Sequence, residues 1–300
     1  MSADASATLE RQRIEGFYTA RRITELYLHP VQGKFDAVHL KEINRRIFQD
    51  LPKAGYPSLK PGEYRQAVPP HQDWVKERVM EGISVPSIVA YSAMDDKAIG
   101  QLNQTLDGIN LTALSALSTE NFSQAMGQLY AQLDYIHPFP DGNSRTLREF
   151  TRSLAENCGY DLDWTRFNID KHGRNVLCIA RDLSVNLLAL PHLRDHRTTR
   201  SVTLMLDQFA ENRNMPDLFR DAIRPSRACA FEEWKEDEAM AAFPELSGAY
   251  NILQAAGAYG LRKFPEDRSQ REEFIASVRM KIQRSLDAGE VPQGNTHRPA

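Results

Sequence analysis

Apolar residues recur at helical spacing along most of the chain, and this periodicity limits the fold more than any other feature of the sequence. One run, with intervals of four, three, four and three residues, is Phe122, Met126, Leu129, Leu133 and Ile136. Such intervals place the side chains on one face of a helix. The same pattern predicts helices over residues 9–28, 36–51 and 161–190. We therefore expect a mainly helical protein.

Polar and turn-forming residues mark the expected ends of these helices. Asp36 is a predicted N-cap of the second helix, and Ser118 caps the helix that runs into His137. Residues 52–70 hold five prolines and are expected to form a loop. Residues 82–91 are rich in β-branched side chains, and they predict a short hairpin or flap that Pro86 restricts to an edge.

Charge and composition narrow the range of partners. Lysine and arginine number 37 against 40 acidic residues, so the net charge of −3 gives no general attraction for nucleic acid or an anionic membrane. No run of about 18 uncharged apolar residues occurs, and no membrane span is expected. Three widely spaced cysteines argue against a disulfide framework or a zinc site. A cytoplasmic protein is predicted, while injection into a host cell stays open because its signal need follow no pattern.

The densest group of chemically capable residues lies between two predicted helices, from His137 to Arg148. Prolines and a glycine break the first helix, and a second is expected from Ser144 to about residue 157. Gly142 lets the backbone approach an anion closely, and the free amides at the start of the second helix favour negative charge. The sequence therefore predicts a phosphate site in this loop.

Charged side chains around the loop suit a nucleotide. Arg145 and Arg148 are three residues apart and share a helix face, which Arg152 continues. Guanidinium groups bind phosphate oxygens through two donors at once. Asp141 is placed to hold Mg²⁺ against the same phosphates, and His137 is the natural general base. A solvated helix face is the alternative explanation of the three arginines.

The stretch from His137 to Arg148 resembles the signature of the Fic (filamentation induced by cAMP) family. That signature is His-x-Phe-x-Asp/Glu-Gly-Asn-x-Arg-x-x-Arg, and every fixed position is matched. Further similarity lies in Gly33-x-Phe35-Asp36-x-x-His39-Leu40, in Gly62-x-x-Arg65 and in residues 159–164. The resemblance covers about residues 33–190. It implies an all-α protein, a Fic-type helical bundle with a small β-hairpin flap and a helical C-terminal extension.

The resemblance implies a bacterial protein adenylyltransferase, which moves AMP from ATP to a Tyr, Thr or Ser hydroxyl of a target protein with Mg²⁺. It gives His137 the role of base, Asp141 that of metal ligand and Phe139 that of core anchor. The implied nucleotide and phosphate contacts are Gly142, Asn143, Ser144, Arg145 and Arg148. Glycine is commonest at the position of Ser144, and a lysine there marks a phosphate-transferring subgroup. A small, uncharged serine favours AMP transfer.

Residues 84–91 match the position of the family's flap, which pairs with the target protein by strand addition. The residues expected to dock the target are Val85, Ile88, Val89 and Tyr91.

Many relatives are restrained by a helix of pattern Ser/Thr-x-x-x-Glu-Gly/Asn, whose Glu blocks the second arginine. Neither Glu10, which Arg11 follows, nor Glu211, with Asp207 at the first position, matches this pattern fully. No standard internal inhibitor is therefore expected, and a separate antitoxin-like protein would be the inhibitory partner.

Four segments are predicted: an N-terminal helical segment (1–32), a Fic-like catalytic domain (33–195), a helical C-terminal extension (196–290) and a disordered tail (291–300). Two other functions compete with AMP transfer. One is phosphotransfer or another nucleotidyl transfer at the same site, which differs in whether the α- or the γ-phosphate reaches the target. The other is a catalytically silent nucleotide-binding module, which would bind ATP without any transfer.

Overall fold

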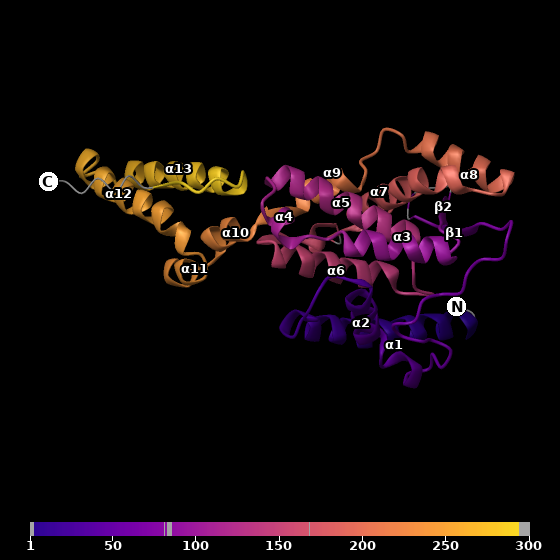
Figure 1. The fold of residues 1–300 in the computed structure, drawn as a ribbon. Coiled ribbons are helices and arrows are strands. Elements are labelled where there is room, and N and C mark those ends of the chain that lie inside the picture. The colour runs from indigo at the N-terminus through magenta and orange to yellow at the C-terminus, as the bar shows by residue number, and fades with distance from the viewer. Residues whose placement is uncertain (1–2, 81, 83–85, 168, 294–300) are drawn as a thin grey trace.

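A computed structural model describes residues 3–80, 82, 86–167 and 169–293 of the chain. Within these residues it has thirteen α-helices and two antiparallel two-stranded sheets (Figure 1). The first nine helices are α1 (Ala3–Leu28), α2 (Ala37–Phe48), α3 (Asp96–Asp107), α4 (Leu111–Ser115), α5 (Thr119–Ile136), α6 (Asn143–Asn157), α7 (Lys171–Ala189), α8 (His196–Gln208) and α9 (Met215–Ala222). The last four are α10 (Ser226–Glu233), α11 (Glu236–Ala242), α12 (Ser247–Lys263) and α13 (Arg268–Asp287). The strands are β1 (Trp74–Arg78), β2 (Ser87–Tyr91), β3 (Tyr160–Leu162) and β4 (Ile223–Pro225). The all-α expectation with a small hairpin is confirmed.

Helix α5 lies in the main hydrophobic core, where α3, α6, α7 and α9 contact it. Phe122, Met126 and Leu133 are completely buried, as their spacing predicted. Each such side chain contributes ~1.5–3 kcal/mol relative to an exposed one. Helix α9 approaches α5 closely because Gly127 has no side chain: a Cβ there would lie 2.5 Å from Cα of Pro216. The core thus fixes the end of α5, from which His137 emerges.

The helix ends follow the predicted signals. Asp36 accepts hydrogen bonds from backbone N–H groups two and three residues further on, at 3.0 Å each. Ser118 likewise caps α5 by accepting from the N–H of Asn121. Gly159 follows α6 with a φ of 83°, the left-handed conformation that ends many helices. Residues 54–70 contain no helix or strand, in agreement with their prolines.

The hairpin differs from the prediction in its first strand. β2 lies in the expected segment, but its partner is β1, so that Lys76 lies opposite Val89. The sequence analysis missed β1, in which the side chains of Val75 and Glu77 are exposed and the others are half-buried. Such a strand gives a weak sequence signal, because the apolar Val75 lies on the exposed face and the charged Lys76 on the half-buried face. The second sheet, β3 with β4, was also missed, since three-residue strands show no periodicity.

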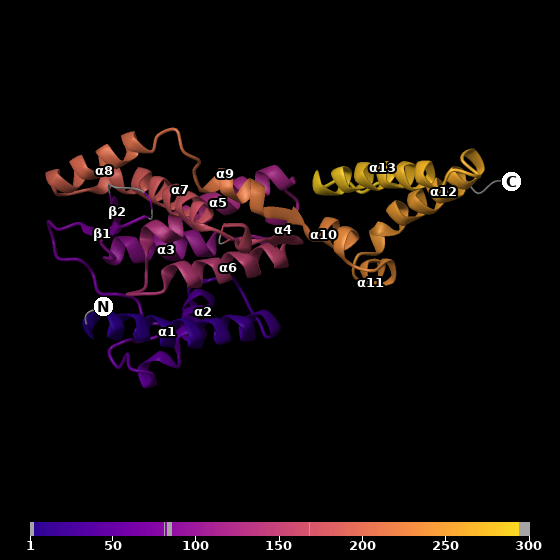
Figure 2. The same ribbon diagram turned by 180° about the vertical axis from the view of Figure 1, so that it is seen from behind.

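The four C-terminal helices have a small core of their own. Phe231, Leu246 and Ile282 are among its buried residues. Figures 1 and 2 show α11 to α13 reaching away from the other helices, whereas α8 packs on β2 and α9 on α5. We therefore propose a boundary near residue 226 instead of 196. Residues 291–293 have no regular structure, and the rest of the predicted tail lies outside the described residues.

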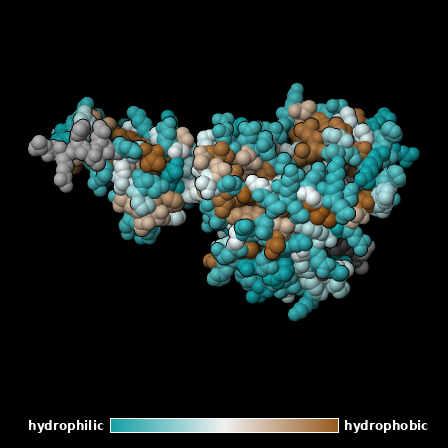
Figure 3. All heavy atoms as spheres, in the orientation of Figure 1, coloured by the Kyte–Doolittle hydropathy of each residue, from teal (hydrophilic) through white to brown (hydrophobic). Residues whose placement is uncertain are grey.

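Figure 3 shows a mainly hydrophilic surface on which apolar residues form scattered patches. Among the helices that the structure describes, none is both long and apolar enough to cross a membrane.

Candidate active site

Arg65 holds the backbone of His137 in an uncommon conformation at the end of α5. The φ and ψ of His137 are 50° and 59°, a left-handed conformation that residues with a side chain seldom adopt. The guanidinium of Arg65 donates to the carbonyl oxygens of His137 at 2.8 Å and of Ser92 at 2.7 Å. The backbone N–H of Arg65 donates to the carbonyl oxygen of Pro138 at 2.8 Å. These bonds offset the conformational cost and turn the chain out of the helix.

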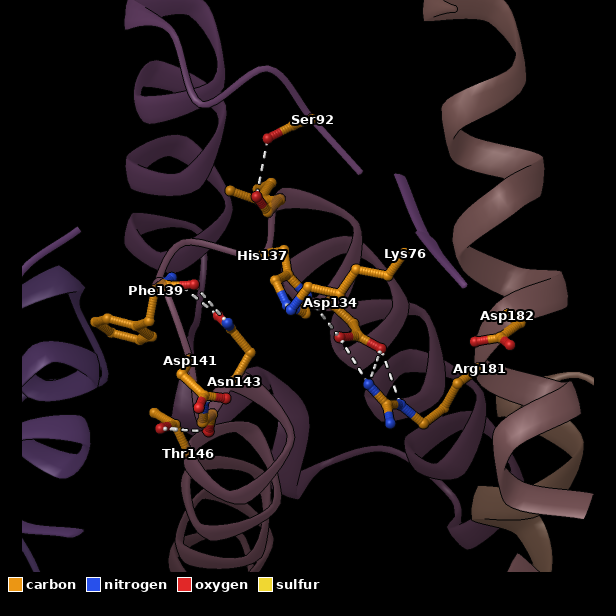
Figure 4. A network of polar contacts seen from close by, with 12 residues as sticks. Lys76, Ser92, Asp134, His137, Phe139, Asp141, Asn143, Thr146, Arg181 and Asp182 are labelled. Carbon is orange, nitrogen blue, oxygen red and sulfur yellow. Dashed lines mark hydrogen bonds and ion pairs between the residues drawn. The ribbon is translucent and has the colours of Figure 1, made fainter. Parts of the chain in front are cut away.

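Aromatic and charged side chains lie around the ring of His137, and Figure 4 shows the charged ones, Lys76 and Asp134. The ring centroid of Tyr91 lies 3.9 Å from that of the imidazole. Nζ of Lys76 lies 3.2 Å from Nε2, and Oδ1 of Asp134 lies 3.4 Å from Nδ1. Burial lowers the pKa of His137 to about 4, against the opposite effect of Asp134. The imidazole is therefore neutral at pH 7, which is the state that a general base requires.

Asn143 fixes the loop that follows His137. Its side-chain oxygen accepts from the N–H of Phe139 at 2.9 Å, and its side-chain nitrogen donates to the carbonyl of Phe139 at 2.7 Å. Phe139 is fully buried beside Tyr64, as expected of a core anchor. Both polar ends of the Asn143 side chain are thus occupied. Asn143 can contribute its backbone N–H to an anion site, but the amide group shapes the loop instead.

Gly142 stands where the loop meets α6, and both space and conformation require glycine. Its φ is 77°, and an added Cβ would lie only 2.0 Å from the ring of Phe48 on α2. The N–H of Gly142 donates to Oδ1 of Asp141 at 2.6 Å. Asp141 and Ser144 line the same pocket as His137. The loop and the base therefore face one space, as the sequence predicted.

This pocket holds about 220 Å³, somewhat below the ~300–1,000 Å³ typical of small-molecule sites. Its lining residues are Lys76, Glu77, Arg78, Tyr91, His137, Asp141, Gly142, Asn143, Ser144, Arg145 and Arg181.

The three arginines expected on one face of α6 are divided between two sides. Arg145 lines the pocket, lies over the ring of Phe48 at 4.8 Å and pairs with Glu15 of α1. Arg148 is turned inward, with its guanidinium carbon 5.6 Å from the ring of Trp164. Burial lowers the pKa of Arg148, and its Nε has no hydrogen-bond partner among the described residues.

Arg152 lies outside the pocket, which corrects the expectation that it continues the phosphate-binding face. It pairs with Glu149 at 2.6 Å and with Glu156 at 2.9 Å, and it lies 3.9 Å over the ring of Tyr27. Because the buried carboxylate of Glu149 already satisfies it, Arg152 stabilises the packing of α6 on α1.

The flap residues are placed mostly in the interior. Val89 and Tyr91 are 1% and 5% exposed, so their side chains are not accessible to a docking target. Ile88 is half-buried, and Val85 lies outside the described residues. The side chain of Asn186 covers one edge of β2, since it accepts from the N–H of Ala90 and donates to the carbonyl of Ile88. A target protein therefore cannot contact this hairpin through the side chains of Val89 and Tyr91, as the sequence had led us to expect.

The open edge of the hairpin belongs to β1. Since Asn186 takes the outward groups of β2 at residues 88 and 90, the ladder between the strands runs through Lys76 and Val89. In an antiparallel ladder the neighbouring residues, Val75 and Glu77, then direct their N–H and C=O groups away from β2.

Four residues near the site were not singled out from the sequence: Glu15, Lys76, Asp134 and Arg181. Asp134 carried a usable signal, because an acidic residue three positions before a candidate base lies one helical turn behind it. Glu15 followed by Gly16 also fits the end of the inhibitory pattern, but Arg11 stands where Ser or Thr is expected. Lys76 and Arg181 gave no signal, since only the tertiary fold brings β1 and α7 to the loop.

The carboxylates near the loop decide whether the implied Mg²⁺ could bind there. No group of three or more His, Cys, Asp or Glu residues that could hold a metal occurs in the part of the chain that the structure describes. Mg²⁺ commonly keeps several waters and uses one or two carboxylates together with substrate phosphates. Asp141, on the loop that precedes α6, fits that mode of binding, and Glu77 on β1 is the other carboxylate in the lining of the pocket.

The fold and site define a helical domain in which a glycine-containing loop, the start of α6 and a neutral histidine share one pocket. Residues 34–155 match the model of the Fic/DOC family, and this chain contains a domain of that family.

Two curated relatives are similar to the chain. Protein adenylyltransferase VbhT of Bartonella schoenbuchensis is 30% identical over 156 residues, which are 52% of this chain and 28% of the relative. A protein adenylyltransferase of Bartonella henselae is 25% identical over 194 residues, 64% of this chain and 34% of the relative. The chain thus spans about a third or less of the length of these relatives.

Solved structures with a similar course of the chain include two Bartonella effector proteins. The N-terminal Fic domain of a putative cell filamentation protein from Bartonella quintana, with bound ADP, is 22% identical with a TM-score of 0.45, covering 72% of this chain and 86% of the other. BepC from Bartonella tribocorum, with bound AMPPNP, is 16% identical with a TM-score of 0.46, covering 72% and 87%.

Proposed function

We propose that this protein transfers AMP from ATP to a hydroxyl side chain (Tyr, Thr or Ser) of a target protein. The observation that carries the proposal is that a neutral His137 and the loop from Asp141 to Arg145 line one pocket. The names of the two curated relatives support the proposal, because both are protein adenylyltransferases and both contain a segment similar to this chain.

In the proposed reaction Nε2 of His137 accepts the proton of the target hydroxyl. The hydroxyl oxygen bonds to the α-phosphorus of ATP, the bond from that phosphorus to the bridging oxygen breaks, and pyrophosphate leaves. The first turn of α6, which begins after Gly142, offers backbone N–H groups to phosphate oxygens, and Arg145 offers a cation. His137 contributes by position and by its neutral state, both of which exist before a ligand binds.

Mg²⁺, held by Asp141 and by the nucleotide itself, would supply charge neutralisation at the phosphates. Asp141 also accepts the N–H of Gly142, which couples the carboxylate to the loop conformation.

We place target docking at the open edge of β1. An extended segment of the target can add a strand there, using the outward backbone groups at Val75 and Glu77. Lys76, between them, faces the pocket and His137. A hydroxyl residue of the added strand would then lie next to the base.

The test uses ATP labelled at the α- or γ-phosphate, with bacterial and host lysates as sources of target. AMP transfer predicts α-label on protein, and His137→Ala should lower its rate by about 10² to 10⁴-fold. His196→Ala, at an exposed histidine far from the motif in sequence, is the matched control and should keep the full rate. Label from the γ-phosphate would show phosphotransfer instead, and ATP binding without labelling would show a silent module.

A further inference from the structure

His137 lies between two groups of opposite charge, one at each ring nitrogen. Lys76 approaches Nε2 to 3.2 Å, and an ammonium group is a donor only. Nε2 must therefore accept, and the proton of the neutral ring belongs on Nδ1. On that side lies the carboxylate of Asp134, which is an acceptor only, at 3.4 Å. Both neighbours favour the same tautomer.

Asp134 is itself held rigidly. It is 1% exposed, and Arg181 of α7 donates to both of its oxygens at 2.8 to 3.0 Å (Figure 4). Burial alone would raise the pKa of Asp134, but the charges and hydrogen bonds of Arg181 and His137 together outweigh burial, lower the pKa and keep the carboxylate ionised. The helical turn between Asp134 and His137 fixes their separation. The orientation of this carboxylate is thus set by two helices, independently of any ligand.

We propose that Asp134, held by Arg181, is a positioning residue that keeps the proton of His137 on Nδ1 and the lone pair of Nε2 toward the pocket. The contact lacks hydrogen-bond geometry in this state, and Nδ1 has no other hydrogen-bond partner among the described residues. When a target hydroxyl replaces Lys76 and gives its proton to Nε2, the ring becomes a cation. Its attraction to the carboxylate then grows, as in other histidine bases backed by an aspartate.

A merely structural role for Asp134, as the counter-ion of Arg181, is the competing account. Asp182 provides the comparison, because it is equally buried and belongs to the same region. It pairs with Arg78 at 3.1 Å and accepts from the hydroxyl of Ser87 at 2.8 Å. No dashed line joins Asp182 to His137 in Figure 4. Loss of its charge should disturb packing without affecting the tautomer.

The test measures the ring nitrogens directly, by NMR of the full chain labelled with ¹⁵N-histidine. His137→Ala identifies the signals of that ring among those of the eight histidines. All variants are compared in a Lys76→Met background, because the ammonium group of Lys76 favours the same tautomer by itself. In this background we expect the Nδ1–H tautomer, with or without Asp182→Asn. In Asp134→Asn the single acceptor of the amide goes to Arg181, its NH₂ faces Nδ1, and the Nε2–H tautomer should gain. An unchanged tautomer in folded Asp134→Asn would overturn the proposal.

The paired variant Asp134→Leu with Arg181→Met removes both buried charges, and it serves if the single variant does not fold. It too should lose the tautomer preference, and retention of the preference would equally overturn the proposal. The tautomer does not depend on the proposed activity. If AMP transfer is confirmed, Asp134→Asn should lower its rate by about 10² to 10⁴-fold. If no transfer occurs in the wild type, the proposed function fails while the NMR result still decides the role of Asp134.

Discussion

The loop from His137 to Arg148 has a buried flank and a solvent-facing flank, and the two hold their charges differently. On the buried flank Asp134 and Arg181 are 1% and 5% exposed and pair through three short contacts. On the other flank the side chains of Arg145 and Glu15 are 30% and 21% exposed. Breaking a buried ion pair has a large free-energy cost. In a partly exposed pair another anion can readily replace the carboxylate. One short motif thus joins the proposed base, which is fixed, to the proposed phosphate contact, which is exchangeable.

The largest expected effect concerns the buried flank. Arg181→Met leaves the carboxylate of Asp134 buried without a counter-ion, and should lower the free energy of unfolding by about 3–5 kcal/mol. Denaturant unfolding followed by tryptophan fluorescence measures this. Arg145→Met, which breaks the half-exposed pair, is the matched comparison and should cost no more than about 1 kcal/mol. Equal losses in the two variants would remove the distinction between the flanks.

Gly142→Ala tests the point where the loop meets α6. The new Cβ would overlap the ring of Phe48, and the φ of 77° adds strain, so Phe48 must move. Because Arg145 lies over the same ring, the phosphate contact is disturbed as well. We expect a loss of about 1–3 kcal/mol in stability together with weaker ATP binding. Calorimetric titration with ATP would reveal whether binding survives, and unchanged affinity would mean that the loop does not meet the nucleotide.

Glu15→Gln should act in the opposite direction. Glu15 occupies Arg145 in the structure, so a phosphate must displace it before binding there. Removal of the negative charge should tighten ATP binding about two- to fivefold, in line with the ~0.5–1 kcal/mol of a partly exposed pair. Weaker binding would show that Glu15 orients Arg145 for the nucleotide.

Glu10→Gly and Glu211→Gly are the matched controls for Glu15. The sequence analysis compared both with the inhibitory pattern, and both side chains are exposed. Neither change should alter activity. A higher rate of AMP transfer in either variant would indicate that the mutated glutamate is part of an inhibitory helix.

The difference between the flanks also explains what the sequence could predict. His137, Asp141, Gly142 and Ser144 were predicted as site residues because one loop between two periodic helices carries them, and the structure places all four at one pocket. The helices themselves followed from apolar spacing and from caps such as Asp36.

Lys76 and Arg181 could not be found in the same way. They reach the loop from β1 and α7, about 60 and 45 residues away in sequence, and no local pattern records a contact of that range. The spacing of Arg145, Arg148 and Arg152 suggested one common role. In the structure each has a different neighbour: Arg145 pairs with Glu15, Arg148 lies near the ring of Trp164, and Arg152 pairs with Glu149. Helical spacing gives a direction from the axis, while the role depends on which neighbour lies there.

The smallest expected effect is an absence of pH dependence on the buried flank. Burial lowers the pKa of His137 to about 4, so the neutral base persists as the pH falls from 8 to about 5. An ordinary histidine, with a pKa near 6.5, would instead lose roughly fivefold in neutral fraction between pH 6.5 and 5.5. The rate of AMP transfer at saturating ATP should therefore stay nearly constant over this range. Melting temperatures in the same buffers would separate unfolding from titration. A rate that falls about fivefold between pH 6.5 and 5.5 in folded protein would mean that water reaches the ring, and that the flank described as fixed opens in solution.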